Sequence, residues 1–207
     1  NIRDTERYTL ADRNMILIIT SGLGKHLVDF KSHQFTNGSL IFIAQGQVHK
    51  FDYKPGNSGY IIFFSNRFLN SNLNSLSQSW LFNYHVDPLN IQVNAKMREH
   101  FFDIIEKMYQ EFRSNNTFAK NEVIKTLLYL LLVRSERIKR ELISKDALNR
   151  SDIIFDFIKV TEEKFYESRN ADYFAKQMNI SYKHLNNICK QTLHKTAKTF
   201  IDEFLVL

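Results

Sequence analysis

Residues 172–193 read DYFAKQMNISYKHLNNICKQTL and decide the fold of the C-terminal part of the chain. Their apolar spacing predicts a short helix over 172–178, with Phe174 among its inward residues. A tight turn follows at Asn179, because asparagine tolerates the left-handed conformation that ends a helix. Ser181 occupies the N-cap position of a second helix that extends to about Leu193. Two short helices joined in this way predict a helix-turn-helix unit.

The second helix has two chemically different sides. Its buried stripe contains Leu185, Ile188 and Cys189. Its opposite side presents Lys183, Asn186, Asn187 and Lys190. Asparagine can pair with adenine through two hydrogen bonds, and lysine can donate to guanine or to phosphate, so this side suits the major groove of DNA. Helical pairs with one polar face also occur in proteins that do not bind DNA, and the pattern alone leaves that alternative open.

Basic residues gather near the same segment. The chain has a formal net charge of +6, while residues 1–90 hold eight basic and six acidic residues, or +2. Between 169 and 200 one acidic residue, Asp172, stands against six basic ones, which gives +5. The six are Arg169, Lys176, Lys183, Lys190, Lys195 and Lys198. This concentration indicates an anionic partner, although a solvated helix face would also explain it.

The run from Tyr173 to Lys190, with Lys195 to Ile201 after it, resembles the first helix-turn-helix of AraC/XylS-type transcription regulators. That family shows Ala-x-x-Leu-x-Ile-Ser-x-x-x-Leu-x-x-x-Phe-Lys and then a Tyr/Phe-Ile pair. The resemblance implies base contacts by the third, sixth and seventh residues counted from the serine, here Lys183, Asn186 and Asn187. The residues that we expect at the DNA backbone are Lys176, Ser181, Tyr182, Lys190, Lys195 and Lys198.

The sequence departs from the family pattern at three places. The family has two helix-turn-helix units joined by a linker helix, and this chain ends at Leu207, within the expected linker helix, so we expect an incomplete DNA-binding module. His194 stands where the family often has glycine after the recognition helix. Cys189 replaces the usual aromatic core residue.

The N-terminal part has a different pattern, with short apolar runs between turn signals. The runs 15–20, 40–44 and 60–64 are rich in β-branched and aromatic residues, and both faces of these segments look buried. Asn37-Gly38 and the stretch 55–59 mark turns between them. Strands of this length and spacing predict a small antiparallel barrel or sandwich.

From Asn94 the apolar period becomes helical. A first helix carries one apolar stripe, broken by Ser114-Asn115-Asn116, and a second extends over about 118–142. The stripe consists of Met97, Phe101, Ile104, Ile105, Met108 and Phe112. The second helix is apolar on nearly every side over 127–133, which predicts contact with two surfaces. One is the outer wall of the barrel, and the other is a second subunit or, equally, the neighbouring helix of an intramolecular hairpin.

The front half also resembles the cupin-type sensor domain of these regulators, through the strand at 15–20, Asp29-Phe30 and FIAQGQVHKF at 42–51. We predict an α+β fold: a cupin-like antiparallel β-barrel with two C-terminal helices over 1–145, then an incomplete all-α helix-turn-helix module over 150–207. The hydrophobic pattern lapses between Ser144 and Ser151, and Ser151 with Asp152 predicts the N-cap of a new helix. That helix carries Ile154, Phe157, Ile158 and Phe165.

Catalytic or metal-binding residues are not expected. Cupin enzymes hold a metal through a His-x-His pair, a glutamate and a later histidine, and only His49 matches the last ligand. His26 and His33 are separated by seven positions and do not form the required pair. We therefore predict no cofactor. The candidate effector-binding residues are Arg13, Lys31, His49 and Tyr53, and for His49 a structural role at a strand turn is the main alternative.

The function predicted from these patterns is a ligand-responsive, sequence-specific DNA-binding transcription regulator. Its partners would be double-stranded DNA, a small-molecule effector and a second copy of the chain, bound through helices 94–142. One cysteine and the absence of a long uncharged apolar run predict a cytoplasmic protein without membrane contact. The alternatives are a metal-dependent cupin enzyme with a helical appendage and a dimeric ligand-binding module that does not bind DNA.

Overall fold

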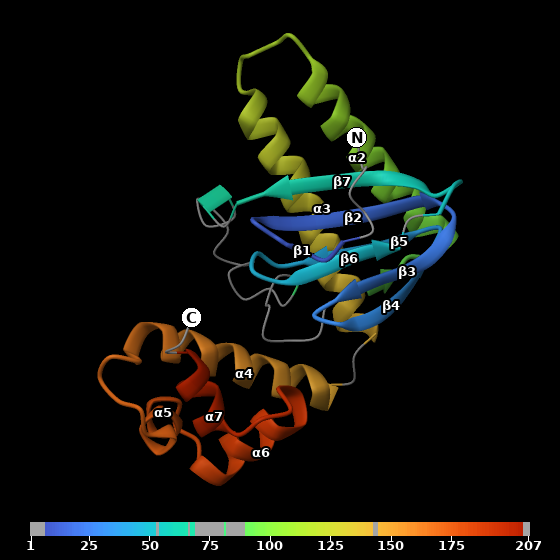
Figure 1. Cartoon of the computed structure of the whole chain (residues 1–207). Coiled ribbons are helices and arrows are strands. Elements are labelled where there is room, and N and C mark those ends of the chain that lie inside the picture. The colour runs from blue at the N-terminus through green and yellow to red at the C-terminus, as the bar shows by residue number, and fades with distance from the viewer. Residues whose placement is uncertain are drawn as a thin grey trace. The chain divides into compact units, whose positions relative to one another are not determined.

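The computed structural model describes residues 7–52, 54–65, 67–68, 81, 90–142 and 145–204. The chain forms two compact units, Asn1–Lys139 and Arg140–Leu207. The first contains the strands and a long helical hairpin, and the second contains short helices (Figure 1).

The first unit contains two four-stranded antiparallel sheets, which confirms the predicted cupin-like α+β fold. One sheet has the strand order β1 (Thr9–Leu10), β6 (Val48–Asp52), β3 (Leu23–Val28), β4 (Lys31–Thr36). The other has the order β7 (Ser58–Phe64), β2 (Asn14–Ser21), β5 (Ser39–Ile43), β8 (Asn90–Gln92). The three strands expected from the apolar runs are β2, β5 and β7.

Strands β2 and β5 are buried on both faces, as their apolar runs predicted, whereas the same expectation for β7 is wrong because Ile61 and Phe63 are exposed. Successive side chains of a strand point to opposite faces, so neighbouring residues of β2 enter different cores. Met15, Leu17 and Ile19 join the core that also holds Val28 and Phe35 of the other sheet. Ile16 and Ile18 join a second core, formed with the helical hairpin.

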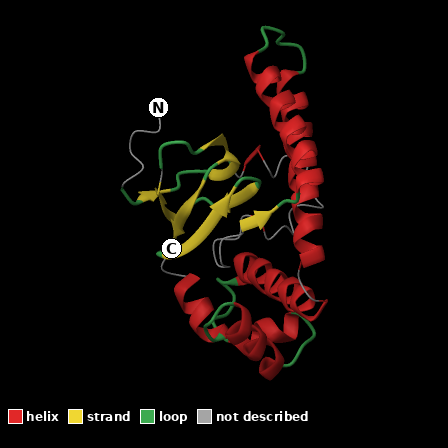
Figure 2. Ribbon diagram, turned by 90° about the vertical axis from the view of Figure 1, so that its right-hand side faces the viewer, coloured by secondary structure: helices red, strands yellow, loops and turns green. Residues whose placement is uncertain are grey.

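The hairpin consists of α2 (Ala95–Arg113) and α3 (Lys120–Leu142) and lies along one side of the strands (Figure 2). Asn94 caps α2 by accepting a hydrogen bond from the Met97 N–H (2.9 Å), and Ser114 ends it as expected. The buried stripe is Phe101, Ile104, Ile105 and Met108. Phe112 was expected in this stripe but is 69% exposed, because the hairpin extends past the sheet before the turn.

The second unit contains α4 (Lys145–Lys164), α5 (Ala171–Gln177), α6 (Tyr182–Thr192) and α7 (Ala197–Phe204). Phe157 of α4 contacts the rings of Phe174 and Phe200, at centroid distances of 6.2 and 5.3 Å. Cys189 is fully buried in the same unit, which agrees with its expected core position.

Two expectations for α4 are wrong. Ser151 lies inside the helix rather than at its N-cap, because no glycine or proline interrupts the preceding polar segment and the helix continues through it. Phe165 was expected on this helix but follows the end of α4 and is 37% exposed. Ile154, Phe157 and Ile158 lie on α4 as predicted, and their side chains are buried. Among the described residues, no helix has the length and hydropathy that crossing a bilayer requires.

Candidate ligand cavity and nucleic-acid interface

A cavity of about 630 Å³ lies among strands of both sheets in the first unit. This volume falls within the range of small-molecule sites, roughly 300–1,000 Å³. The apolar part of its lining includes Met15, Leu17, Ile19, Phe51, Ile61 and Phe63. The polar part includes His26, His49 and Asn57.

The alternation of β3 places His26 on the inner face of its sheet. Alternate residues of this strand differ in burial: His26 and Val28 are buried, whereas Lys25 is exposed. His26 stands opposite Phe51 of β6 and opposite His33 of β4 in the strand register. The rings of His26 and His49 stack with their centroids 5.3 Å apart.

His26 is fully buried, and neither of its ring nitrogens has a hydrogen-bond partner among the described residues. Burial, together with the neighbouring His49 and His33, lowers the pKa of His26 to about 3. Burial also lowers the pKa of His49. The cavity therefore contains imidazole rings that are neutral at physiological pH.

The structure places the four expected effector-binding residues in different surroundings. His49 lines the cavity, and its Nδ1 atom has no hydrogen-bond partner in the described part of the chain. Arg13 does not itself line this cavity, but its guanidinium binds the carboxylate of Asp12, which does (3.0 Å). Lys31 is exposed at the start of β4 and is also outside the lining. Tyr53 lies outside the described residues.

Sequence reasoning missed His26 and Asn57. The period-two pattern of Leu23–Val28 could have placed His26 on a buried face, although the exposed Lys25 and the glycine make this segment look like a turn. The position of Asn57 depends on a contact between two loops that no local pattern reveals. Among the described residues, no group of three or more histidine, cysteine or acidic side chains is arranged to hold a metal ion.

The second unit contains the two helices and the turn that the quoted stretch predicted. Asn179 has a φ of 56°, the left-handed conformation expected there. The Ile180 N–H donates to the carbonyl of Ala175 (3.0 Å), which closes the end of α5. Ser181 caps α6 by accepting a hydrogen bond from the His184 N–H (3.1 Å). The turn therefore fixes the direction in which α6 leaves α5.

The residues expected at DNA bases differ in their surroundings. Lys183 and Asn187 are exposed on α6, as is His184, which the sequence analysis did not include. Asn186 is half-buried, and its Oδ1 atom accepts a hydrogen bond from the Ala197 N–H (3.1 Å). Leu185, Ile188 and Cys189 are buried, which confirms the predicted division of α6 into two sides.

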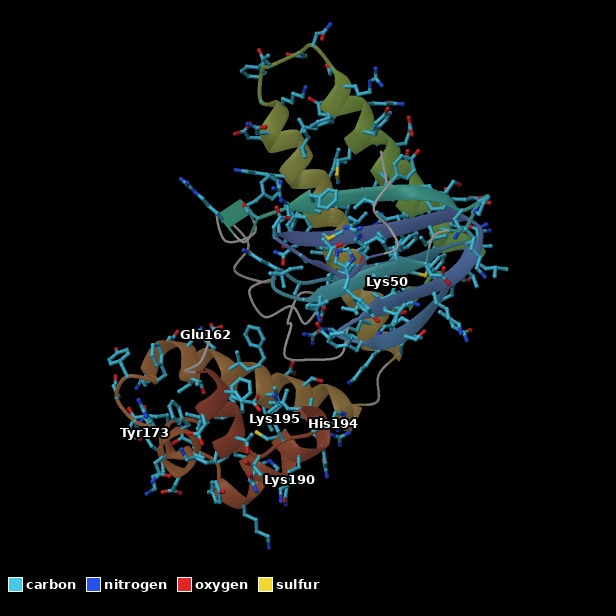
Figure 3. The ribbon with its side chains drawn as sticks, viewed as in Figure 1. Lys50, Glu162, Tyr173, Lys190, His194 and Lys195 are labelled. Carbon is cyan, nitrogen blue, oxygen red and sulfur yellow. The ribbon has the colours of Figure 1, made fainter. Side chains whose placement is uncertain are left out.

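The expected backbone-contacting residues divide into two groups. Lys176 pairs with Asp172 (2.7 Å), Lys195 with Glu203, and Lys198 with Asp202. Lys190 is exposed on α6 and, with Lys183, forms no ion pair in the described part of the chain (Figure 3). Ser181 and Tyr182 are exposed at the start of α6. Carboxylates therefore offset part of the basic surplus of this unit.

A family model described as the AraC-like ligand binding domain matches residues 5–132. The chain belongs to this family. The AraC-like match includes the eight strands found among the described residues, the lining of the cavity, α2 and the first part of α3. Helices α4 to α7 lie outside the matched residues.

Solved structures that are similar to this AraC-like chain share little sequence identity with it. ToxT from Vibrio cholerae O395, bound to (E)-4-(8-methylnaphthalen-1-yl)but-3-enoic acid, is 13% identical over 94% of this chain and 93% of that one, with a TM-score of 0.41. Apo ToxT K231A from Vibrio cholerae strain SCE256 is 13% identical, with coverages of 95% and 91% and a TM-score of 0.42. The AraC-like transcriptional activator CuxR is 10% identical, with coverages of 95% and 66% and a TM-score of 0.40. No curated protein matches the chain.

Proposed function

We propose that this chain is a ligand-responsive, sequence-specific DNA-binding transcription regulator. In this proposal residues 1–145 bind an effector and dimerise, and residues 150–207 bind DNA. The observation that supports it most is the combination of an AraC-like ligand binding domain with a capped helix whose exposed face is polar and basic. The effector would enter the cavity between the sheets and bias the arrangement of the two units.

We expect α6 to read DNA with its exposed side in the major groove. Lys183 and Asn187 are free to face bases, and a lost base contact costs about 1–3 kcal/mol. Asn186 has a more restricted role. Pairing with adenine requires both its amide oxygen and its nitrogen, and the oxygen already accepts a hydrogen bond from Ala197.

The DNA backbone contacts would come from lysines and from the start of α6. Lys190 and Lys183 carry charges that no described carboxylate offsets, so we expect them to contribute most to phosphate binding. Lys176, Lys195 and Lys198 must exchange an acidic partner for a phosphate. Ser181 and Tyr182 stand at a helix N-terminus, where the orphan N–H groups favour an anion.

We also propose that the chain forms a homodimer through helices 94–142. Apolar side chains are exposed on this hairpin although its inner side is buried, and they include Tyr109, Phe112, Phe118, Val123 and Leu130. Burying them against a second copy would remove apolar surface from water. Sedimentation of Phe112→Ser and Phe118→Ser variants against the unmodified protein measures this directly: we expect weaker self-association.

The test of DNA binding is selection of duplexes from a random pool by the full-length protein, followed by mobility shifts with the enriched sequence. Asn187→Ala should lower the preference for the selected sequence over random duplex by about tenfold. The matched control is Gln110→Ala, which removes an exposed amide from α2 in the other unit. A protein that selects no sequence, or an Asn187→Ala variant with unchanged preference, would contradict the proposal.

A further inference from the structure

Two buried polar side chains in the cavity lack the hydrogen bonds that such groups require. His26 is fully buried and Asn57 is 9% exposed, and both line the cavity. Both ring nitrogens of His26 and the Nδ2 atom of Asn57 have no partner among the described residues. Buried polar groups are hydrogen-bonded in the great majority of native structures, and a group without a partner is destabilising. These two side chains therefore point to something that enters the cavity and binds them.

Asn57 is held firmly in its place. Its backbone N–H donates to the carbonyl of Lys54 (3.0 Å), and its side chain packs directly over Gly22. A Cβ atom at residue 22 would collide with the Asn57 Oδ1 atom, and Gly22 also has a φ of 100°, which favours glycine. The amide of Asn57 is thus presented to the cavity by the close approach of the two loops.

The chemistry of these groups specifies their partner. A neutral imidazole has one N–H donor and one acceptor nitrogen, so His26 needs both an acceptor and a donor. The Nδ2 group of Asn57 needs an acceptor. A hydroxyl group can both donate and accept, whereas a carboxylate can only accept. The low pKa of His26 agrees with this, since a protonated ring, which would suit an anion, is strongly disfavoured there.

We propose that the cavity binds an uncharged amphiphile, whose hydroxyl or hydroxyl-and-carbonyl head group bonds His26 and Asn57 and whose apolar body lies against the walls formed by both sheets. This inference rests on the proposed function, because it takes the cavity as the effector site.

The rest of the lining favours an apolar body over a sugar-like or ionic ligand. Met15, Leu17, Phe51, Ile61 and Phe63 surround the histidines with side chains that cannot form hydrogen bonds. The lining also includes one cation, Arg7, and one carboxylate, Asp12, which is paired with Arg13 outside the lining (3.0 Å). Apolar side chains therefore outnumber charged ones in the lining.

Calorimetric titration of the full chain at pH 7.5 with 1-octanol and with octanoate tests the head group. We expect saturable binding of 1-octanol and at least about tenfold weaker binding of octanoate, the difference that one misplaced polar group produces in a buried site. His26→Phe should weaken the binding of 1-octanol by a similar factor. His100→Phe, which changes an exposed histidine of α2, should leave this binding unchanged. Octanoate binding as tight as 1-octanol, no binding of either probe, or an unchanged His26→Phe variant would each overturn the proposal.

Thermal denaturation without any ligand gives an independent readout. If His26 is kept for a ligand, removing its unsatisfied nitrogens should raise the Tm of His26→Phe above that of the unmodified chain. A lowered Tm would show that the imidazole is needed by the fold itself and would overturn the assignment. Neither measurement contains DNA, so a failure here leaves the duplex selection unaffected, and a failed selection leaves these results unaffected.

Discussion

The amide oxygen of Asn186 accepts a hydrogen bond from the backbone N–H of Ala197, the first residue of α7, at 3.1 Å. At the same end of α7, the Thr196 Oγ1 atom accepts a hydrogen bond from the Thr199 N–H (3.0 Å). A residue expected to read DNA from α6 thus also satisfies an orphan donor at the start of α7. Its exposed neighbour Asn187 has no comparable contact to another helix in the described structure.

This contact predicts that the two asparagines fail in different ways. Asn186→Ala should lower the free energy of unfolding by about 1 kcal/mol, as the loss of a helix cap does, while Asn187→Ala should leave it nearly unchanged. Asn187→Ala should instead reduce sequence preference in mobility shifts. Equal stability of both variants in urea denaturation would show that the bond to Ala197 contributes nothing.

His194 offers a second prediction, because it has a φ of 57° in the connection between α6 and α7. A side chain with a Cβ is strained in this conformation, and glycine is not. His194→Gly should therefore raise the free energy of unfolding by roughly 0.5–1 kcal/mol. Asn179→Gly is the matched control, since Asn179 has a φ of 56° but asparagine tolerates it better. A gain at Asn179 as large as that at His194 would contradict this explanation.

The ion pairs of α7 make a third prediction about affinity. Asp202→Asn and Glu203→Gln should release Lys198 and Lys195 for phosphates. We expect tighter DNA binding and a salt dependence steeper by about 0.9 in log–log slope for each lysine recruited. The control is Asp103→Asn, which breaks an i,i+4 pair with Lys107 in the other unit (2.7 Å). Unchanged affinity in the α7 variants would show that these lysines do not approach the duplex.

The burial of His26 makes a fourth prediction, about pH. Its pKa is lowered to about 3 in the folded chain, while the unfolded chain has the ordinary value near 6.5. Between these values the unfolded state binds more protons, so acid favours unfolding and the stability present above pH 6.5 is lost as the pH falls. The free energy of unfolding should decrease by up to about 1.4 kcal/mol per pH unit in this window because of His26.

His26→Phe should flatten this part of the pH profile, measured by urea denaturation at several pH values between 4 and 7. His49 also has a lowered pKa, so a smaller slope should remain in the variant. A profile that His26→Phe does not change would mean that the ring is accessible to protons in the folded chain.

Local signals in the sequence were sufficient for much of the fold. Asn179 and Ser181 have the turn and cap roles that their chemistry suggested, because caps depend on only a few neighbouring residues. The N-cap expected at Ser151 was wrong because a serine caps a helix only where the helix begins, and α4 begins six residues earlier, at Lys145. Without a glycine or proline, the helix continued.

The candidate sites depended on contacts between distant segments and were harder to predict. His26 reaches the cavity because β3 pairs with β4 and β6, and Asn57 because its loop meets Gly22. Asn186 differs from Asn187 because its side chain accepts a hydrogen bond from Ala197, which is eleven positions later in the chain and begins α7. The alternation along β3 places His26 on a buried face but does not show which residues it meets, and the other two arrangements have no periodic signal. The assignment of Lys183, Asn186 and Asn187 to DNA bases stays a prediction.

Because β2 is buried on both faces, it is the strand that separates the cavity from the core of the hairpin. Met15 and Leu17 touch the space in which a guest molecule would sit, and Ile16, the residue between them, is packed with the side chains of the hairpin. A guest that shifts this strand by a fraction of an ångström must also repack the interior on the reverse side, because closely packed interiors transmit displacement rather than absorb it. We therefore expect occupancy of the cavity to displace side chains of the hairpin directly, through β2 alone.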